Sequence, residues 1–166
     1  FAAVLEGRSV AISAPRYLGK SSLLAHVQTA EVQRLYGLNP KRWIFARVPC
    51  SKVSTAPELV DLAVEAIRRA LGLRTHSLLS PTAQQVLERR DPEDTQSEAL
   101  PRNLSDLSPV GRSLQARHGG LVLLLDDFEN LLALPDRAIL TDLLGLAASG
   151  VPLILTLDHD PHEIIQ

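Results

Sequence analysis

Residues 9–24 read SVAISAPRYLGKSSLL, and no other stretch says more about the architecture of this chain. The apolar run 9–13 has the length and composition of a buried strand. A loop that contains Pro15 follows, and from Gly19 to position 36 apolar side chains recur at helical spacing. The stretch therefore predicts a strand, a loop and a helix in that order, which is the unit from which α/β folds are built.

The rest of the chain continues this alternation. Apolar runs predict further strands at 42–48, 121–125 and 151–157. Apolar residues at helical spacing predict further helices at 55–72, 81–90, 108–118 and 135–148. Because strands separated by helices require right-handed crossovers, we expect a parallel sheet with helices on both faces, which is an α/β three-layer sandwich.

The composition excludes several classes of protein. Hydrophobic residues make up 45% of the 166 residues and charged residues 22%, as in an ordinary globular domain. A net charge of −2 provides no basic surface, so nucleic acid is not indicated as a partner. The longest apolar run, 121–125, is too short to span a membrane. A single cysteine, Cys50, and the lack of a secretory signal at the start favour the cytoplasm.

Two features bear on the organisation of the chain. The segment 91–98, DPEDTQSE, is polar and acidic, so we expect a mobile loop over 91–106. No Met occurs anywhere, including position 1, which favours a piece of a longer polypeptide. No internal repeat divides the chain, and 1–166 is expected to form one domain.

Residues 14–21, APRYLGKS, match the phosphate-binding loop pattern except at the first position, where the pattern has Gly. Backbone N–H groups of such a loop, with the positive end of the following helix, surround a phosphate. Lys20 would neutralise phosphate charge, and the Ser21 hydroxyl would ligate Mg²⁺. We therefore expect a nucleotide with Mg²⁺ here. The predicted nucleotide-binding residues are Ala14, Pro15, Arg16, Tyr17, Leu18, Gly19, Lys20, Ser21 and Ser22.

Ala14 replaces the first glycine of the pattern. Because Pro15 restricts the residue before it to extended conformations, position 14 does not need a positive φ, and alanine is tolerated there. The alternative interpretation is a simple turn at Gly19 with a solvated Lys20. The position of the motif between a predicted strand and a predicted helix argues against that alternative.

A second motif lies at 121–127, LVLLLDD. An apolar strand that ends in an acidic residue is the Walker B pattern, whose Asp holds Mg²⁺ beside the phosphate loop. Asp126 is the predicted Mg²⁺ partner. Asp127 is the candidate general base, a second catalytic residue beside Lys20, and Glu129 could take its place. An Asp pair that caps the next helix is the alternative.

Together the two motifs resemble the AAA+/STAND group of P-loop ATPases, signal-transduction ATPases with numerous domains. Residues 13–24 are similar to the group's Gly-Pro-Arg-Arg-x-Gly-Lys-Thr/Ser-Ser-Leu-Leu, and 123–129, LLLDDFE, is similar to its Walker B segment. The resemblance runs from about 7 to 158 and implies a P-loop NTPase fold of the ASCE/AAA+ type. It also implies ATP or ADP with Mg²⁺ as cofactors and a γ-phosphate sensor after the fourth strand. Thr156 is the candidate sensor, and an ordinary β-branched strand residue is the alternative.

The resemblance also implies a role. Such proteins exchange ADP for ATP to switch between a resting and an assembled state, so the expected partners are nucleotide, other domains of the same polypeptide and further copies of the chain. The group's helical lid would lie outside 1–166. An ATP-hydrolysing regulatory switch is the leading hypothesis, and a non-hydrolysing scaffold is the alternative because Asp127 replaces Glu. A small-molecule kinase is less favoured, since no arginine-rich lid segment follows 121–127, and a missing Asn-Lys-x-Asp segment disfavours guanine.

Overall fold

The computed structural model describes residues 2–72, 75–88 and 103–158, which form an α/β fold around a parallel sheet. The strands are β1 (Val10–Ser13), β2 (Trp43–Pro49), β3 (Gly120–Asp126) and β4 (Leu153–Leu157). Their order across the four-stranded sheet is β1-β4-β3-β2, and every neighbouring pair is parallel. The predicted parallel sheet is confirmed, and the predicted strand ends differ from the observed ones by one or two residues.

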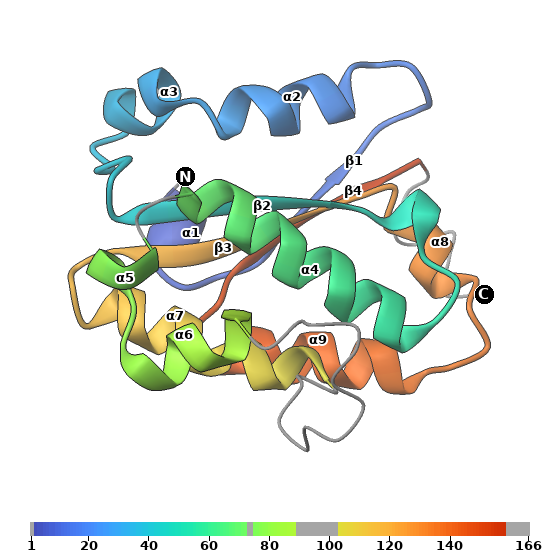
Figure 1. The fold of residues 1–166 in the computed structure, drawn as a ribbon. Helices are drawn as coiled ribbons and strands as arrows, with labels where there is room; N and C mark the ends of the chain where they lie inside the picture. The colour runs from blue at the N-terminus through green and yellow to red at the C-terminus, as the bar shows by residue number, and fades with distance from the viewer. Residues whose placement is uncertain (1, 73–74, 89–102, 159–166) are drawn as a thin grey trace, which may run out of the picture.

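Helices cover both faces of the sheet (Figure 1). One face carries α1 (Ala2–Leu5), α2 (Lys20–Val27) and α3 (Ala30–Leu35). The other face carries α4 (Ala56–Leu71), α6 (Pro81–Glu88), α7 (Ser108–Gln115) and α9 (Ala138–Ala148), with the 3-10 turn η3 (Leu104–Leu107) packed among them. The fold therefore has the layers that the alternation of strands and helices predicts.

The central strand β3 divides the core into two parts. Every residue of β3 is buried, because helices cover both faces of the sheet. Leu121, Leu123 and Leu125 belong to the larger cluster, on the side of α4, α7 and α9, whereas Val122 and Leu124 belong to the smaller cluster beside α2. Side chains that alternate between two cores fix the register of β3, and with it the position of Asp126 at its end.

The start and end of α4 follow the sequence signals. The Thr55 hydroxyl accepts a hydrogen bond from the N–H of Glu58 at 3.4 Å, and the Glu58 carboxylate accepts one from the N–H of Ser54 at 2.7 Å. The first bond satisfies an N–H group that the first helical turn leaves without a partner, and the second holds the residue that precedes the cap. The helix ends at Leu71, and Gly72 follows with a φ of 56°.

The single helix predicted from 19 to 36 is wrong, because the structure divides it into α2 and α3. Gln28 and Thr29 separate the two helices. The Thr29 hydroxyl donates to the carbonyl of His26 at 2.8 Å and accepts from the N–H of Val32 at 3.4 Å, so it caps α3. A threonine side chain that bonds to the neighbouring backbone competes with helix continuation, and here it ends α2.

Several short elements were not predicted: α1, α5 (Thr75–Leu78), α8 (Glu129–Leu132) and the 3-10 turn η1 (Cys50–Lys52). The helix predicted at 135–148 begins only at Ala138, and the one predicted at 108–118 ends at Gln115. Of the loop predicted at 91–106, residues 91–102 lie outside the described residues, and Asn103 caps η3. None of the helices described here is long and apolar enough to cross a membrane.

All four strands point the same way, so their carboxyl ends meet at one edge of the sheet. The segments that follow β1, β3 and β4 therefore lie close together, with β4 between the other two strands. In open α/β sheets this edge is the usual place for ligands.

Candidate functional site

The loop 14–19 joins the end of β1 to the first turn of α2. The N–H of Ala14 donates to the carbonyl of Leu157 at 3.2 Å, which extends the pairing of β1 with β4 by one residue. Ala14 is not among the residues with positive φ, whereas Gly19 has a φ of 78° and Tyr17 a φ of 66°. The left-handed positions are thus later in the loop, and this is why alanine can replace glycine at position 14.

Lys20 is the first residue of α2, and its side chain folds back into the loop. Its Nζ donates to the carbonyl of Ala14 at 2.6 Å and to that of Pro15 at 3.0 Å. It also forms an ion pair with Oδ1 of Asp158 at 2.7 Å, and both side chains are buried. An ammonium group has three N–H donors, so these contacts use all of them. Lys20 therefore lies where a phosphate-loop lysine is expected, but its donors are directed at the protein itself.

Asp158 follows β4 directly and holds two cations of the loop. Besides Lys20, it accepts a hydrogen bond from Nε of Arg16 on its other oxygen. The hydrogen bonds from Lys20 and Arg16 lower the pKa of Asp158 to about 2. The sequence analysis did not single out Asp158 as a site residue. Asp158 meets these two cations only because β4 pairs with β1, and the sequence does not reveal that pairing.

Asp126 ends β3 and accepts hydrogen bonds on both carboxylate oxygens. Oδ1 accepts from the hydroxyl of Ser21 at 3.1 Å and from that of Thr156 at 2.9 Å. Oδ2 accepts from Nε of Arg47 at 3.1 Å and from a second nitrogen of the same guanidinium. Burial would raise the pKa of Asp126, but the hydrogen bonds from Arg47, Thr156 and Ser21 together lower it. Asp126 is therefore held as a carboxylate next to the loop serine.

Arg47 of β2 was not predicted as a site residue. Nothing in the sequence separates it from other arginines, because only the pairing of β2 with β3 brings it to Asp126, which is 79 positions away. Its guanidinium bonds the Asp126 oxygen that Ser21 and Thr156 leave open.

Asp127 adopts a left-handed backbone conformation with a φ of 56°. Asp tolerates this region better than most residues. Its N–H donates to the Thr156 hydroxyl at 3.0 Å, and its carbonyl accepts from the Asn130 side chain at 2.9 Å. Burial raises the pKa of the Asp127 carboxyl, and the negative charges of Asp126 and Asp158 add to that increase. A carboxyl whose pKa is raised in this way is a better proton acceptor once ionised.

Glu129 begins α8, close to the same group of charges. Its Oε2 is buried and has no hydrogen-bond partner among the described residues. Burial, followed by the negative charge of Asp158, raises the pKa of Glu129. Glu129 is thus a second carboxyl with a raised pKa at this edge of the sheet. It remains the alternative to Asp127 as the candidate general base.

Thr156 is fully buried and connects the two acids. Its hydroxyl donates to Asp126 and accepts from the N–H of Asp127, so both hydrogen-bonding roles serve the turn after β3. The structure thus gives Thr156 a positioning role that the sequence did not predict, and its proposed role as a sensor stays a prediction.

The structure brings together five of the predicted residues: Lys20, Ser21, Asp126, Asp127 and Thr156. Of the other loop residues, Ala14 and Pro15 accept hydrogen bonds from Lys20 through their carbonyls, and Arg16 pairs with Asp158. Tyr17 and Leu18 are 99% and 67% exposed, and Ser22 is also exposed, so these three side chains contribute no contact to the cluster.

The oxygen ligands at this place fit a Mg²⁺ ion. Ser21 and Asp126 supply a hydroxyl and a carboxylate in direct contact, and such hard oxygen ligands are what Mg²⁺ prefers. Among the described residues no group of three or more His, Cys, Asp or Glu side chains could hold a metal alone. An ion at this place would therefore need further oxygens from water or phosphate, which is usual for Mg²⁺.

Comparison with known proteins gives no family for this chain. No family model matches it, and a search of curated proteins finds no match either.

Proposed function

We propose that the chain binds ATP or ADP with Mg²⁺ at the loop 14–22 and is the nucleotide-binding core of a cytoplasmic regulatory switch, a P-loop ATPase of the AAA+/STAND type. The observation that carries the proposal is the 3.1 Å hydrogen bond from Ser21 to Asp126, 105 positions apart. This bond joins one residue of each motif, and it lies next to the buried Lys20 at the start of α2. If Gly19 only formed a turn and Asp126 only capped a helix, this contact between the two segments would not be expected.

Each residue has a part in this proposal. The N–H groups at the start of α2 and the Lys20 ammonium bind the phosphates. Ser21 and Asp126 hold the Mg²⁺ ion, directly and through water. When bound, the ion would offset the charge that develops on the β- and γ-phosphates. Asp127 or Glu129 accepts a proton from the attacking water, which requires the ionised form of that carboxyl.

The side-chain pairs at the site imply an exchange of partners on binding. Lys20 can reach a phosphate only if it leaves Asp158 or the loop carbonyls, because its three donors are in use. Asp126 is free to face a metal through Oδ2 only when Arg47 moves away. The described arrangement is therefore a resting form of the site.

A specific observation favours a second candidate, a nucleotide-bound scaffold that does not hydrolyse. Asp127 has a shorter side chain than Glu and lies in a left-handed turn whose N–H and carbonyl are both bonded. Phosphate release with Mg·ATP, compared between the parent chain and Asp127→Asn, separates the candidates. Asn keeps the size and tolerates the positive φ. Turnover that disappears in Asp127→Asn supports hydrolysis with this base, and binding without any turnover supports the scaffold.

The proposal itself is tested by thermal unfolding with and without Mg·ATP, Mg·ADP and Mg·GTP. A ligand at about one hundred times its dissociation constant stabilises by about 2.7 kcal/mol, which is easily measured as a higher midpoint. Ser21→Ala and Ser54→Ala form a matched pair, since Ser21 bonds Asp126, whereas Ser54 is exposed and lies outside the loop 14–22. We expect the adenine nucleotides to raise the midpoint in Ser54→Ala and much less in Ser21→Ala. Equal responses in both variants would contradict the proposed Mg²⁺ site.

A further inference from the structure

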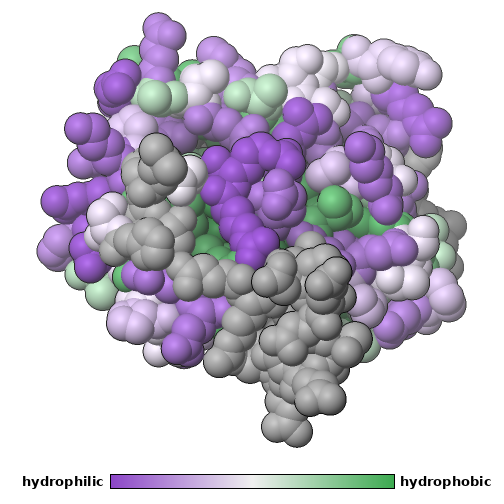
Figure 2. Space-filling view, viewed as in Figure 1, coloured by the Kyte–Doolittle hydropathy of each residue, from purple (hydrophilic) through white to green (hydrophobic). Residues whose placement is uncertain are grey.

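The outer edge of β2 carries a groove that lies outside the loop 14–22. In the part of the sheet that the structure describes, β2 pairs only with β3 and is an edge strand. Figure 1 shows α2 and α3 on one side of this edge and α4 on the other. Seen from the same side, hydrophilic side chains gather over the edge, and apolar residues are visible between them (Figure 2).

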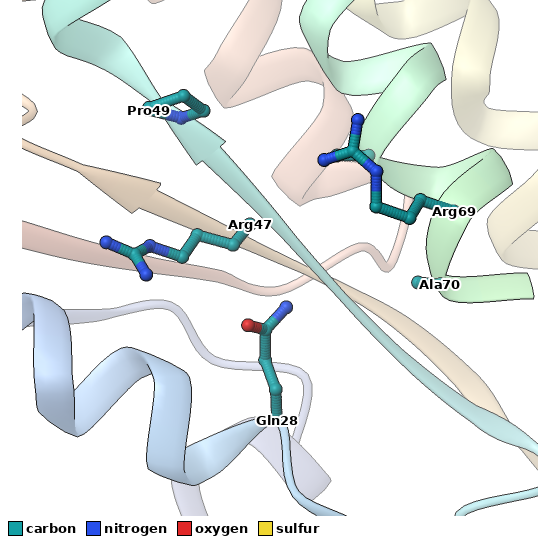
Figure 3. A pocket seen from close by; sticks show the side chains of 6 residues that line it. Gln28, Arg47, Pro49, Arg69 and Ala70 are labelled. Atoms are coloured by element: carbon teal, nitrogen blue, oxygen red, sulfur yellow. The ribbon is translucent and has the colours of Figure 1, made fainter.

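Two hollows follow β2 along this edge. A larger one of about 530 Å³ lies near Trp43 and Phe45, and a smaller one of about 340 Å³ lies near Arg47 and Pro49. Both are lined by Gln28, whose amide donates to the carbonyl of Phe45 at 2.9 Å. In Figure 3 Gln28 points from the end of α2 towards β2, and Arg47 and Arg69 stand around the gap. The two hollows adjoin at Gln28, and we call them together the β2 groove.

The β2 groove has one buried acceptor that lacks a donor. Gln33 is only 4% exposed, and its Oε1 has no hydrogen-bond partner among the described residues. Its amide nitrogen donates to the carbonyl of Gln28 at 3.0 Å, so the residue is held in place. Gln33 lines the larger hollow. Buried acceptors are nearly always satisfied, but this oxygen is almost inaccessible, so a ligand in the groove would bond to it through a small shift of the Gln33 side chain.

The charges along the groove are positive. Arg34 and Lys41 line the larger hollow, are exposed and make no ion pair within the described part of the chain. Arg47 and Arg69 line the smaller one, where they pair with Asp126 and Glu65. Among the described residues neither hollow is lined by Asp or Glu. The charge pattern therefore selects an anionic ligand.

The dimensions favour an extended ligand over a compact one. β2 has seven residues, so the edge is about 23 Å long at the usual rise of a strand. A compact anion would fill one hollow only. A polypeptide in an extended conformation would pass both hollows, offer a backbone N–H to Gln33, and place apolar side chains against Trp43 and Phe45.

We propose that the β2 groove binds an extended acidic segment of polypeptide, laid along β2 with its carboxylates towards Arg34 and Lys41. None of the groove residues belongs to the loop 14–22, although Arg47 lines the smaller hollow and also bonds Asp126 of the proposed nucleotide site. The groove gives the domain a surface for a partner or for another part of the same polypeptide.

Trp43 provides the signal for a test, since it is the only tryptophan of the chain and lines the larger hollow. The probe is a blocked peptide, as long as β2, in which Glu and Val alternate. We expect a saturable change in tryptophan fluorescence at constant ionic strength. A peptide with Lys in place of Glu should give none.

Charge reversal tests the assignment of the groove. Arg34→Glu with Lys41→Glu should weaken binding of the acidic peptide by at least about tenfold, whereas Arg112→Glu, an exposed site on α7, should leave it unchanged. Gln33→Met removes the acceptor at similar volume and should also weaken binding, with folding checked by circular dichroism.

Three results would overturn the proposal. One is no saturable response to the acidic peptide, and another is an equal response in the double charge-reversal variant. The third is displacement of the peptide by citrate at a concentration near the dissociation constant of the peptide. That result would mean that the groove binds small anions. We expect Lys20→Ala to bind the acidic peptide as the parent chain does. That result would show that peptide binding does not depend on the proposed nucleotide site.

Discussion

At the scale of single residues, the carboxyl edge of the sheet is held by pairs of opposite charge. Lys20 and Asp158 are both buried and bonded to each other, and Asp126 is covered by Arg47. Removing one partner of a buried pair leaves an uncompensated charge, which is strongly destabilising. These pairs therefore stabilise the described arrangement, and under the proposed function a phosphate or metal ion would have to supply equivalent charges when it replaces them.

Asp158→Asn should increase the affinity for Mg·ATP. The carboxylate of Asp158 occupies Lys20 and Arg16, and a phosphate must compete with it. A hydrogen bond to a charged group contributes about 1.5–3 kcal/mol, so we expect about a tenfold lower dissociation constant. Titration calorimetry measures the change, with Asp136→Asn, before α9, as the control. An affinity that falls as far as in Lys20→Ala would mean that Asp158 supports the nucleotide instead of competing with it.

Glu129→Gln should stabilise the fold at neutral pH and not at acidic pH. The pKa of Glu129 is raised by burial and by the charge of Asp158, so the folded state disfavours the ionised form. The cost is absent while the carboxyl is protonated and appears as the pH rises through its raised pKa. In a domain of this size, each kcal/mol of such a cost lowers the unfolding midpoint by about 2–4 °C.

Thermal scans of the parent chain and Glu129→Gln across the acidic range measure this difference. Glu31→Gln, on the exposed surface of α3, serves as the control. A difference between Glu129→Gln and the parent chain that does not change with pH would contradict the assignment of a raised pKa to Glu129.

At the scale of elements, the turn from β1 into α2 depends on the backbone more than on side chains. Gly19 precedes α2 with a φ of 78°, although a Cβ there would meet nothing within 4 Å. A side chain at position 19 is therefore disfavoured by the backbone conformation and not by a clash with neighbouring atoms. Gly145, inside α9, also has open space around a Cβ but has no positive φ.

Gly19→Ala and Gly145→Ala should change stability in opposite directions. Forcing alanine into the left-handed region costs about 1–2 kcal/mol, whereas alanine in a helix interior is about 1 kcal/mol better than glycine. Urea unfolding gives the free energy of unfolding of both variants. If the two substitutions had the same effect, the backbone of position 19 would not be what requires glycine.

Sequence patterns predicted elements well where side-chain periodicity determines them, and failed where local bonds do. β3 is recognisable because all its positions are apolar up to Asp126, and α4 because Thr55 and Glu58 mark its start. The break between α2 and α3 was missed because Thr29 reads as an ordinary helical residue until its hydroxyl is seen to cap Val32. Hydrogen bonds of this kind leave no periodic signal.

At the scale of the whole molecule, the parallel order β1-β4-β3-β2 assembles the candidate site. The two motifs, predicted separately, meet through Ser21 and Asp126 because β1 and β3 both flank β4. Arg47 and Asp158 could not be predicted, since each acquires its role only through the pairing of strands distant in the sequence. The residues that belong to the two motifs could thus be predicted. Their charged partners, Arg47 and Asp158, could not.

The central claim, that the loop 14–22 binds Mg·ATP, is tested most directly by titration calorimetry on this chain, on Lys20→Ala and on Lys41→Ala. Lys41 is exposed and distant from the loop in sequence, so it controls for the loss of one positive charge. We predict saturable binding of Mg·ATP in the parent chain and in Lys41→Ala, and none in Lys20→Ala. Binding that persists unchanged in Lys20→Ala, or no binding in a folded parent chain, would contradict the account.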